Sequence, residues 1–178
     1  MLYPAPLRDF LIELAAAGLF HARWTEEIHE EWTRNVLKDR TDLRAEQLER
    51  TRELMNRAVP DCLVANYGPL IEGLELPDPN DRHVLAAAIR SGSEAIVTFN
   101  LRDFPEPYLA LFGIEALHPD KFIYHQFGSN AANVLIAAHR CRERLKNPPK
   151  SANEYLDILE KQGLPQSAGE LRKYSTVI

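Results

Sequence analysis

Apolar residues recur at helical spacing near the start of the chain, at Leu7, Phe10, Leu11 and Leu14. Gly18 follows this run as a C-cap glycine would, so the pattern predicts a helix over residues 6–17. Thr25 stands where an N-cap residue is expected, with glutamates in the turn after it, and predicts a second helix that ends near Leu37. Residues 43–59 place a few apolar positions among many charges, which indicates a third, amphipathic helix on the surface.

The middle of the chain alternates between strand-like and helical patterns. Residues 62–76 predict one short strand and a turn, and a helix follows from about Asp81. Residues 95–99, AIVTF, form a continuous apolar run that is typical of a strand buried on both faces. A second strand is predicted within residues 113–117, and Pro119 suits the first turn of the next helix. This alternation predicts a parallel sheet wrapped by helices.

Beyond about Gly128 the pattern indicates helices alone. One helix is predicted over residues 130–146, after which the segment NPPKS breaks the chain. Capping-box spacing predicts two further helix starts, at Ser151 with Glu154 and at Ser167 with Glu170. We therefore predict an α/β core over residues 1–126 and a helical extension over residues 127–178.

The composition argues against several classes of protein. The chain has 178 residues and a net charge of -5, which is unlike a general nucleic-acid coating protein. Its two cysteines, Cys62 and Cys141, are far apart and outside any CxxC motif, which argues against a disulfide framework or a zinc site. No run approaches the roughly 18 apolar residues of a membrane span, and the start lacks the pattern of a secretory signal. We therefore expect a cytoplasmic protein without a membrane partner.

The most basic segment is HRCRERLKNPPK, residues 139–150. Arg140 and Arg144 lie one helical turn apart, as do Arg142 and Lys146. Such a pattern is typical of a solvated helix face, and a local contact with nucleic acid is the alternative interpretation.

Asp81 opens a predicted helix whose apolar positions follow a 3.6-residue period, at Val84, Leu85, Ala88 and Ile89. Because Asp81 precedes the first two of these by three and four residues, it lies over the buried face, at the N-terminal rim of the helix. Asp78 or Asn80 can cap the helix, which leaves Asp81 without a capping role. An acid favoured by the helix dipole is one interpretation, and an inward-facing functional carboxylate is the other. His83, one position off the apolar stripe, is expected at the surface or rim.

Two more acids are predicted near the same edge of the sheet. Asn100 and Asp103 follow the strand over residues 95–99, and sites in parallel sheets form beyond the carboxyl ends of strands. Turn formation is the alternative role for both residues. Glu31 lies three residues after Ile28, at the edge of the apolar stripe of the second predicted helix, where a solvated glutamate is the common alternative. Glu27 and Glu30 are expected to point further away.

A cluster of Glu31, Asp81 and Asp103 requires compensation, because neighbouring carboxylates repel one another unless protons or a cation neutralise them. A hard divalent cation is the simplest compensating charge. Ligation by oxygen without nearby Cys or His favours magnesium or manganese over zinc.

Two segments, residues 2–35 and residues 76–105, together resemble the PIN-domain ribonucleases. The quoted stretches are LYPAPLRDFLIELAAAGLFHARWTEEIHEEWTRN and LPDPNDRHVLAAAIRSGSEAIVTFNLRDFP. Within that family the chain is similar to bacterial toxin-like members with a C-terminal helical extension, which residues 151–172 resemble. The resemblance implies a three-layer α/β/α fold with a small parallel sheet, and an acidic edge that binds Mg²⁺ or Mn²⁺. It implies hydrolysis of RNA by a metal-activated water, leaving a 5′-phosphate and a 3′-hydroxyl.

By resemblance, the catalytic acids and metal ligands are Glu31, Asp81 and Asp103, and Asn100 stands where many members carry a further aspartate. Four residues beside these ligands are candidates for contact with RNA phosphates: Arg34, Asn35, Arg82 and Arg102. Exposed arginines are common without such a role.

The sequence departs from the family at its start. Members carry an apolar strand and an aspartate a few residues ahead of LYPA, and Met1 stands here in the place of a valine. The first metal ligand and the central strand of the sheet are therefore absent from this sequence. One hypothesis is that both are encoded upstream of Met1, in the same reading frame. The alternative is a genuine start at Met1, for which we expect an unstable, inactive or partner-completed protein.

Three functions are compatible with these patterns. The first is a metal-dependent endoribonuclease, the toxin of a toxin-antitoxin pair, with RNA as substrate, a cognate antitoxin as partner, and a homodimeric state by analogy. The second is a non-catalytic PIN scaffold that binds a partner and has an incomplete metal site. The third is a phosphoryl-transfer domain such as a receiver, which this sequence matches less well because it lacks a strand-end aspartate with a suitably placed lysine.

Overall fold

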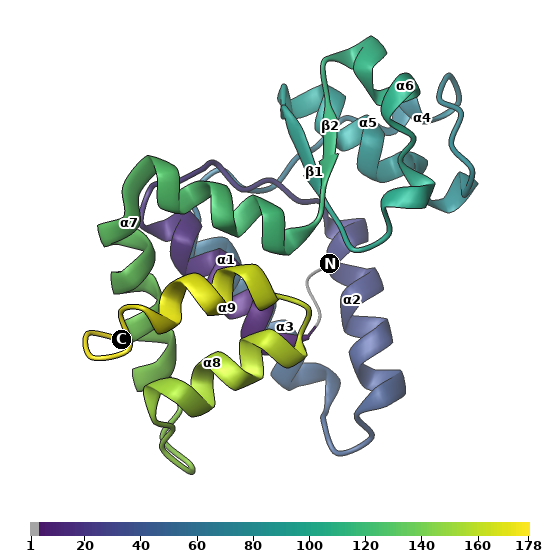
Figure 1. Ribbon diagram of the computed structural model, residues 1–178. Coiled ribbons are helices and arrows are strands. Elements are labelled where there is room, and N and C mark those ends of the chain that lie inside the picture. Colours follow the sequence, from purple (N-terminus) through teal and green to yellow (C-terminus); the bar gives the residue numbers. More distant parts are fainter. Residues whose placement is uncertain (1–3) are drawn as a thin grey trace. The chain divides into compact units, whose positions relative to one another are not determined.

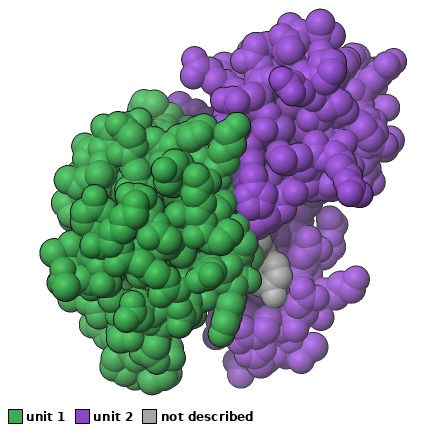
Figure 2. Space-filling view, in the orientation of Figure 1, with its two compact units in different colours: residues 1–21, 119–178 green, residues 22–118 purple. Residues whose placement is uncertain are grey.

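The computed structural model describes residues 4–178 (Figure 1). The fold is mostly helical α/β with a small parallel sheet, as predicted. The chain forms two compact units, which Figure 2 colours separately. Unit 1 contains the chain up to His21 together with Pro119–Ile178, and unit 2 contains Ala22–His118. Among the described residues, no helix is both long and apolar enough to cross a membrane.

The sheet of unit 2 pairs β1 (Ala95–Val97) with β2 (Glu115–Leu117) in parallel, with Ile96 opposite Ala116. Helix α5 (Arg82–Ser91) packs against β1. The core beneath them is built from Leu74, Leu76, Leu85, Ala86, Ala88, Ile96, Phe104, Leu109 and Ile114. The remaining elements around the sheet are short: α4 (Gly68–Ile71), η1 (Pro79–Asp81), η2 (Leu101–Asp103), α6 (Glu106–Leu109) and η3 (Ala110–Phe112).

The end of β1 is set by a local turn. β1 is shorter than the strand predicted over residues 95–99, because the hydroxyl of Thr98 accepts a hydrogen bond from the backbone N–H of Asn100 at 3.1 Å. This bond bends the chain away from the sheet and leaves Phe99 40% exposed. The expectation of a strand buried on both faces therefore holds for Ile96 but not for the residues after it.

The strand predicted within residues 62–76 is reduced to one isolated bridge. Leu63 pairs in parallel with Trp24, through backbone hydrogen bonds that Trp24 makes with Cys62 (2.9 Å) and Val64 (2.8 Å). Asn66 then adopts a left-handed backbone conformation with φ of 60°, which ends the extended segment before α4 begins.

Helices α2 (Glu26–Asp39) and α3 (Ala45–Ala58) form the rest of unit 2. The hydroxyl of Thr25 accepts a hydrogen bond from the backbone N–H of Ile28 at 3.1 Å, which confirms the predicted N-cap of α2. In the amphipathic helix predicted over residues 43–59, Leu48, Met55 and Val59 are buried, whereas Leu54 is exposed.

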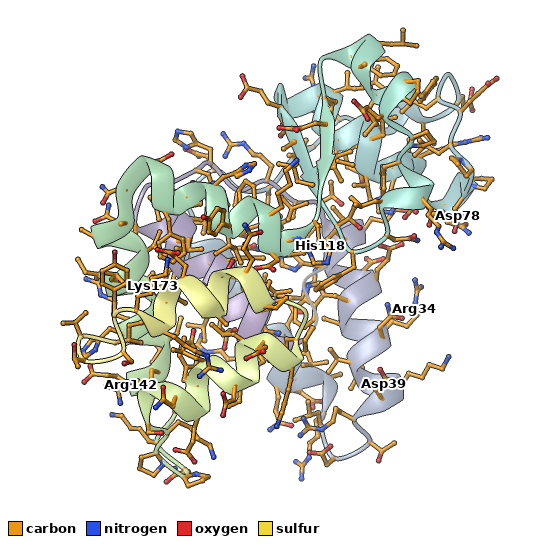
Figure 3. All side chains as sticks on the ribbon, viewed as in Figure 1. Arg34, Asp39, Asp78, His118, Arg142 and Lys173 are labelled. Atoms are coloured by element: carbon orange, nitrogen blue, oxygen red, sulfur yellow. The ribbon has the colours of Figure 1, made fainter. Side chains whose placement is uncertain are left out.

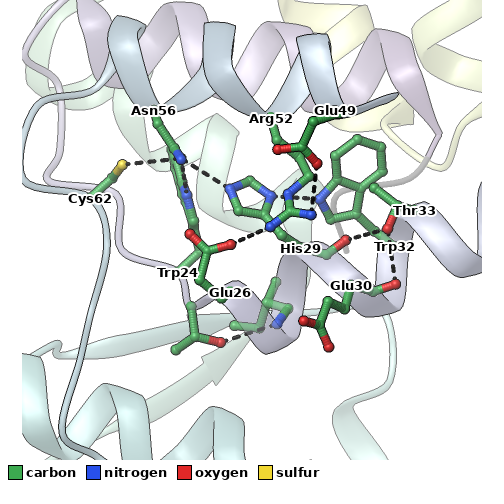
Figure 4. A network of polar contacts seen from close by, with 12 residues as sticks. Trp24, Glu26, His29, Glu30, Trp32, Thr33, Glu49, Arg52, Asn56 and Cys62 are labelled. Carbon is green, nitrogen blue, oxygen red and sulfur yellow. Dashed lines mark hydrogen bonds and ion pairs between the residues drawn. The ribbon is translucent and has the colours of Figure 1, made fainter. Parts of the chain in front are cut away.

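A buried polar network joins α2 to α3 (Figure 4). The Oδ1 atom of Asn56 accepts from Trp24 Nε1 at 2.9 Å and lies 3.0 Å from His29 Nε2 and 3.6 Å from Cys62 Sγ. Trp32 Nε1 donates to His29 Nδ1 at 2.9 Å, so His29 is neutral and donates from Nε2. Burial lowers the pKa of His29, which favours the same neutral form.

We expect Asn56→Ala to destabilise unit 2 by about 2 kcal/mol, because the substitution leaves the buried donors of Trp24 and His29 without their acceptor. Both tryptophans of the chain belong to this network, so urea unfolding followed by tryptophan fluorescence reports on it directly. Asn35→Ala, at an exposed position of α2, is the matched control and should change the unfolding free energy by less than about 0.5 kcal/mol. Equal unfolding midpoints for Asn56→Ala and the wild type would contradict this role.

Unit 1 is a helical assembly of α1 (Ala5–Ala16), α7 (Pro119–Arg144), α8 (Ala152–Lys161) and α9 (Pro165–Arg172). Helix α7 starts at the predicted proline and is interrupted at Asn130, where a helix start was expected, by extended backbone with φ of -160°. The largest fully buried side chains of this unit include Leu7, Phe10, Leu14, Ile123, Tyr155, Leu156, Leu159, Leu164 and Leu171. The capping box predicted at Ser151 is present.

The capping box predicted at Ser167 is wrong. Ser167 lies inside α9, and its hydroxyl donates to the backbone oxygen of Asp120 at 3.1 Å. The carboxylate of Asp120, from α7, accepts from the backbone N–H groups of Gln166 and Ser167, both at 2.8 Å. A residue distant in the sequence therefore caps α9, which local spacing cannot reveal.

The basic segment over residues 139–150 is partly neutralised within unit 1. Glu13 of α1 is buried, and its carboxylate lies 3.3 Å from Arg140 Nη1 and 2.7 Å from Arg144 Nη2. A buried carboxylate needs such partners, so these two arginines serve the packing of α1 against α7.

The boundary predicted between residues 126 and 127 stays a prediction. Helix α1, which the sequence assigns to the α/β core, packs against α7 and α8 in unit 1. The expected departure from the family at Met1, including the strand and aspartate upstream of it, lies outside the residues that the structure describes.

Candidate metal centre

Three aspartates of unit 2 converge at the start of α5. Asp78, Asp81 and Asp103 each offer one carboxylate oxygen, and these oxygens lie within 4.8 Å of one another. All three side chains are partly exposed. Three hard oxygen ligands at this spacing can hold a divalent cation such as Mg²⁺ or Mn²⁺. Figure 3 labels Asp78 at this position in the fold.

Local backbone geometry explains why these aspartates meet. Asp78 and Asp81 frame the 3-10 helix η1, in which residues three apart project in the same direction. Asp78 caps this helix by accepting from the backbone N–H of Asn80 at 2.9 Å, whereas Asp81 makes no capping bond. Asp103 ends η2, which follows the carboxyl end of β1.

The cluster is electrostatically costly. Burial, followed by the charges of Asp103 and Asp78, raises the pKa of Asp81 from 3.8 to about 6. The negative charge of Glu31, on α2, also raises the pKa of Asp81. His83 opposes them and lowers the pKa of Asp81. This repulsion is what a bound cation would relieve, so the donor set fits a divalent metal.

Two of the ligands predicted from the sequence, Asp81 and Asp103, belong to the cluster. The amide nitrogen of Asn100 donates a hydrogen bond to Asp103 Oδ2. Glu31 lies outside the group of three, with its carboxylate 3.3 Å from His83 Nε2. The roles of Glu31 and Asn100 as ligands stay predictions.

Two interpretations of the sequence are wrong at this site. We expected His83 at the surface or rim, but its side chain is only 3% exposed, because α5 turns it toward α2. We expected Glu27 to point away, but its Oε2 atom lies 3.5 Å from His83 Nδ1 and accepts from the Tyr67 hydroxyl at 3.2 Å.

Asp78 was expected from the sequence to have only a capping role. The signal that could have revealed its second role is its spacing of three residues from Asp81, across a proline that favours a tight turn. Asp78 both caps η1 and contributes a carboxylate oxygen to the cluster.

The four candidate RNA contacts are dispersed around the acids. Arg34 and Asn35 are exposed on α2, where Figure 3 labels Arg34. Arg102 is exposed within η2, and Arg82 is half-buried at the first position of α5. Their contacts with RNA stay predictions.

Comparison with known proteins decides the family. A family model described as PIN domain matches residues 1–102, more than half of the chain. The chain belongs to the PIN-domain family. A second model, described as VapC50 C-terminal domain, matches residues 119–173 of this PIN-domain protein. The resemblance stated from the sequence is therefore confirmed, including the C-terminal helical part.

The PIN-domain protein is also similar to a protein of Mycobacterium tuberculosis named "Putative ribonuclease VapC50", with 39% identity over 93 residues. The aligned region covers 52% of this chain and 54% of that relative, so the match spans about half the length of each. No solved structure matches the chain.

We expect Asp81→Asn to stabilise the metal-free protein at neutral pH. The folded-state pKa of Asp81, about 6, lies above its usual value of 3.8, so the folded state binds more protons between these values. Its free energy of unfolding therefore falls as pH rises through that window, and the destabilisation is complete above pH of about 6. Because Asp81 is partly exposed, we expect a gain on the order of 1 kcal/mol, discounted for screening by water.

Urea unfolding at two pH values measures this effect. Asp81→Asn should be more stable than the wild type near pH 7.5, and the two should converge near pH 4, where Asp81 is largely protonated. Glu75→Gln removes one exposed carboxylate of unit 2 outside the cluster and should have little effect at either pH. A wild type that is the more stable protein at pH 7.5 would show that the cluster is not repulsive.

Proposed function

We propose that this PIN-domain protein is a divalent-metal-dependent endoribonuclease that hydrolyses RNA phosphodiester bonds in the cytoplasm. The observation that carries the proposal is the convergence of Asp78, Asp81 and Asp103 in a chain that belongs to the PIN-domain family. The name of the M. tuberculosis relative, which refers to a ribonuclease, supports the same activity.

Asp78, Asp81 and Asp103 would hold the cation, with Glu31 completing the negative charge from α2. Mg²⁺ and Mn²⁺ are the preferred ions because the donors are carboxylate oxygens. A bound cation would supply positive charge to the phosphoryl group and lower the pKa of a water molecule. Attack of that water on phosphorus, with cleavage of the bond to the 3′-oxygen, would leave a 5′-phosphate and a 3′-hydroxyl. Asn100 holds Asp103 through its amide donor, and the dispersed basic side chains Arg34 and Arg102 are available for RNA phosphates.

We further propose that the protein is the toxin of a toxin-antitoxin pair, neutralised by a cognate antitoxin and assembled as a homodimer. The support is its resemblance to toxin-like PIN proteins and the match of residues 119–173 to the VapC50 C-terminal domain. Co-expression with the product of an adjacent small gene tests the pair: the partner should suppress growth inhibition and co-purify with this chain.

The cleavage assay is the direct test. We expect the protein to cleave single-stranded RNA with Mg²⁺ or Mn²⁺, and to lose at least about 100-fold of that activity in Asp81→Asn, since a metal ligand contributes several kcal/mol. Glu75→Gln makes the same change of charge at an exposed position outside the cluster, and this variant should retain activity. Unchanged cleavage in Asp81→Asn would refute the site. A folded wild type without cleavage, but with a partner bound, would favour the non-catalytic scaffold.

Glu31 has a matched control on its own helix. Glu31→Gln should weaken Mn²⁺ binding about tenfold or more, because it removes a negative charge that acts on Asp81. Glu30→Gln makes the same change at the preceding, exposed position and should leave binding unaltered. Calorimetric titration with Mn²⁺ measures both variants, and equal affinities would place Glu31 outside the metal site.

A further inference from the structure

His83 lies between two glutamates of α2. Its Nε2 atom is 3.3 Å from Glu31 Oε1, and its Nδ1 atom is 3.5 Å from Glu27 Oε2. The imidazole is 3% exposed, whereas the side chains of Glu31 and Glu27 are 36% and 48% exposed. A buried imidazole therefore lies next to two partly exposed carboxylates.

Both ring nitrogens of His83 are buried without a hydrogen bond among the described residues. An unsatisfied buried nitrogen is costly, and the two glutamates are the acceptors within ion-pair distance. A small movement of Glu31 toward Nε2 would satisfy one of these nitrogens.

His83 also lies between the start of α5, next to Asp81, and α2, which carries Glu31. It is the second residue of α5 and lies two residues after Asp81, while Glu31 belongs to α2. A partly exposed glutamate loses rotamer freedom when it is held in one orientation. A fixed donor reduces the number of orientations that Glu31 adopts, and such donors behind metal ligands commonly change metal affinity about 10- to 100-fold.

We propose that His83 is a positioning residue: its Nε2–H group donates to Glu31 and orients that carboxylate toward the aspartate cluster. This role rests on the proposed function, since it assumes that the cluster binds a divalent cation. His83 itself contacts neither the cation nor RNA in this arrangement.

Two amide substitutions separate positioning from packing. In His83→Gln the side-chain nitrogen of the introduced glutamine can reach the place of Nε2, whereas in His83→Asn the shorter side chain reaches only the place of Nδ1. We expect Mn²⁺ affinity within about threefold of wild type for His83→Gln and about tenfold weaker for His83→Asn. The full chain is titrated with Mn²⁺ alone, by calorimetry or electron paramagnetic resonance, after circular dichroism has confirmed folding.

A double variant tests whether the effect passes through Glu31. His83→Asn should cause no further loss of affinity in the Glu31→Gln background, because the carboxylate that it positions is already gone. Additive losses, or equal affinities of the glutamine and asparagine variants of His83, would overturn the inference. Absence of Mn²⁺ binding by the wild type would overturn the proposed function itself, so the two failures are distinguishable.

Discussion

Repulsion among the carboxylates of Asp78, Asp81 and Asp103 is the constraint around which unit 2 is organised. Without compensation these groups would separate, so the backbone must hold them together. The tight turn of η1 fixes two of them, and the bend after β1 fixes the third. Burial, and then the charges of the neighbouring carboxylates, raise the pKa of Asp81, which records the cost of this arrangement. Such a cost persists in a folded protein where function requires the groups to be assembled before the ligand arrives.

Helix α2, which carries Glu31, is held in place by buried hydrogen bonds. Helix α2 is fixed to α3 by a polar network around Asn56, in which the ring N–H groups of Trp24, His29 and Trp32 each have a defined acceptor. Such buried hydrogen bonds favour one packing arrangement, because a shift of either helix would leave a ring N–H group unpaired. The rigid side of α2 therefore faces α3, and its side that carries Glu27 and Glu31 faces His83.

The elements that could be predicted from the sequence are those with a strong local signal. The apolar periodicity after Asp81 located α5, and the position of Asp103 beyond a strand located the second carboxylate. What could not be predicted depends on residues far apart in the chain. His83 is buried because α2 packs over it, and Ser167 fails as a cap because Asp120 occupies that role. Asp78 was missed for another reason: one carboxylate can cap a turn and belong to an acidic cluster at the same time.

Unit 1 is assembled from both ends of the described chain, with Ala22–His118 between its two parts. During synthesis, α1 therefore leaves the ribosome long before the helices that cover it. At about 5–20 residues per second, the intervening segment of roughly 100 residues takes on the order of 5–20 s to emerge. Throughout that interval the apolar face of α1, with Leu7, Phe10 and Leu14, has none of its final neighbours from α7 and α8. Unit 2 is continuous in sequence, so all of its residues have left the ribosome before the helices that cover α1 are complete.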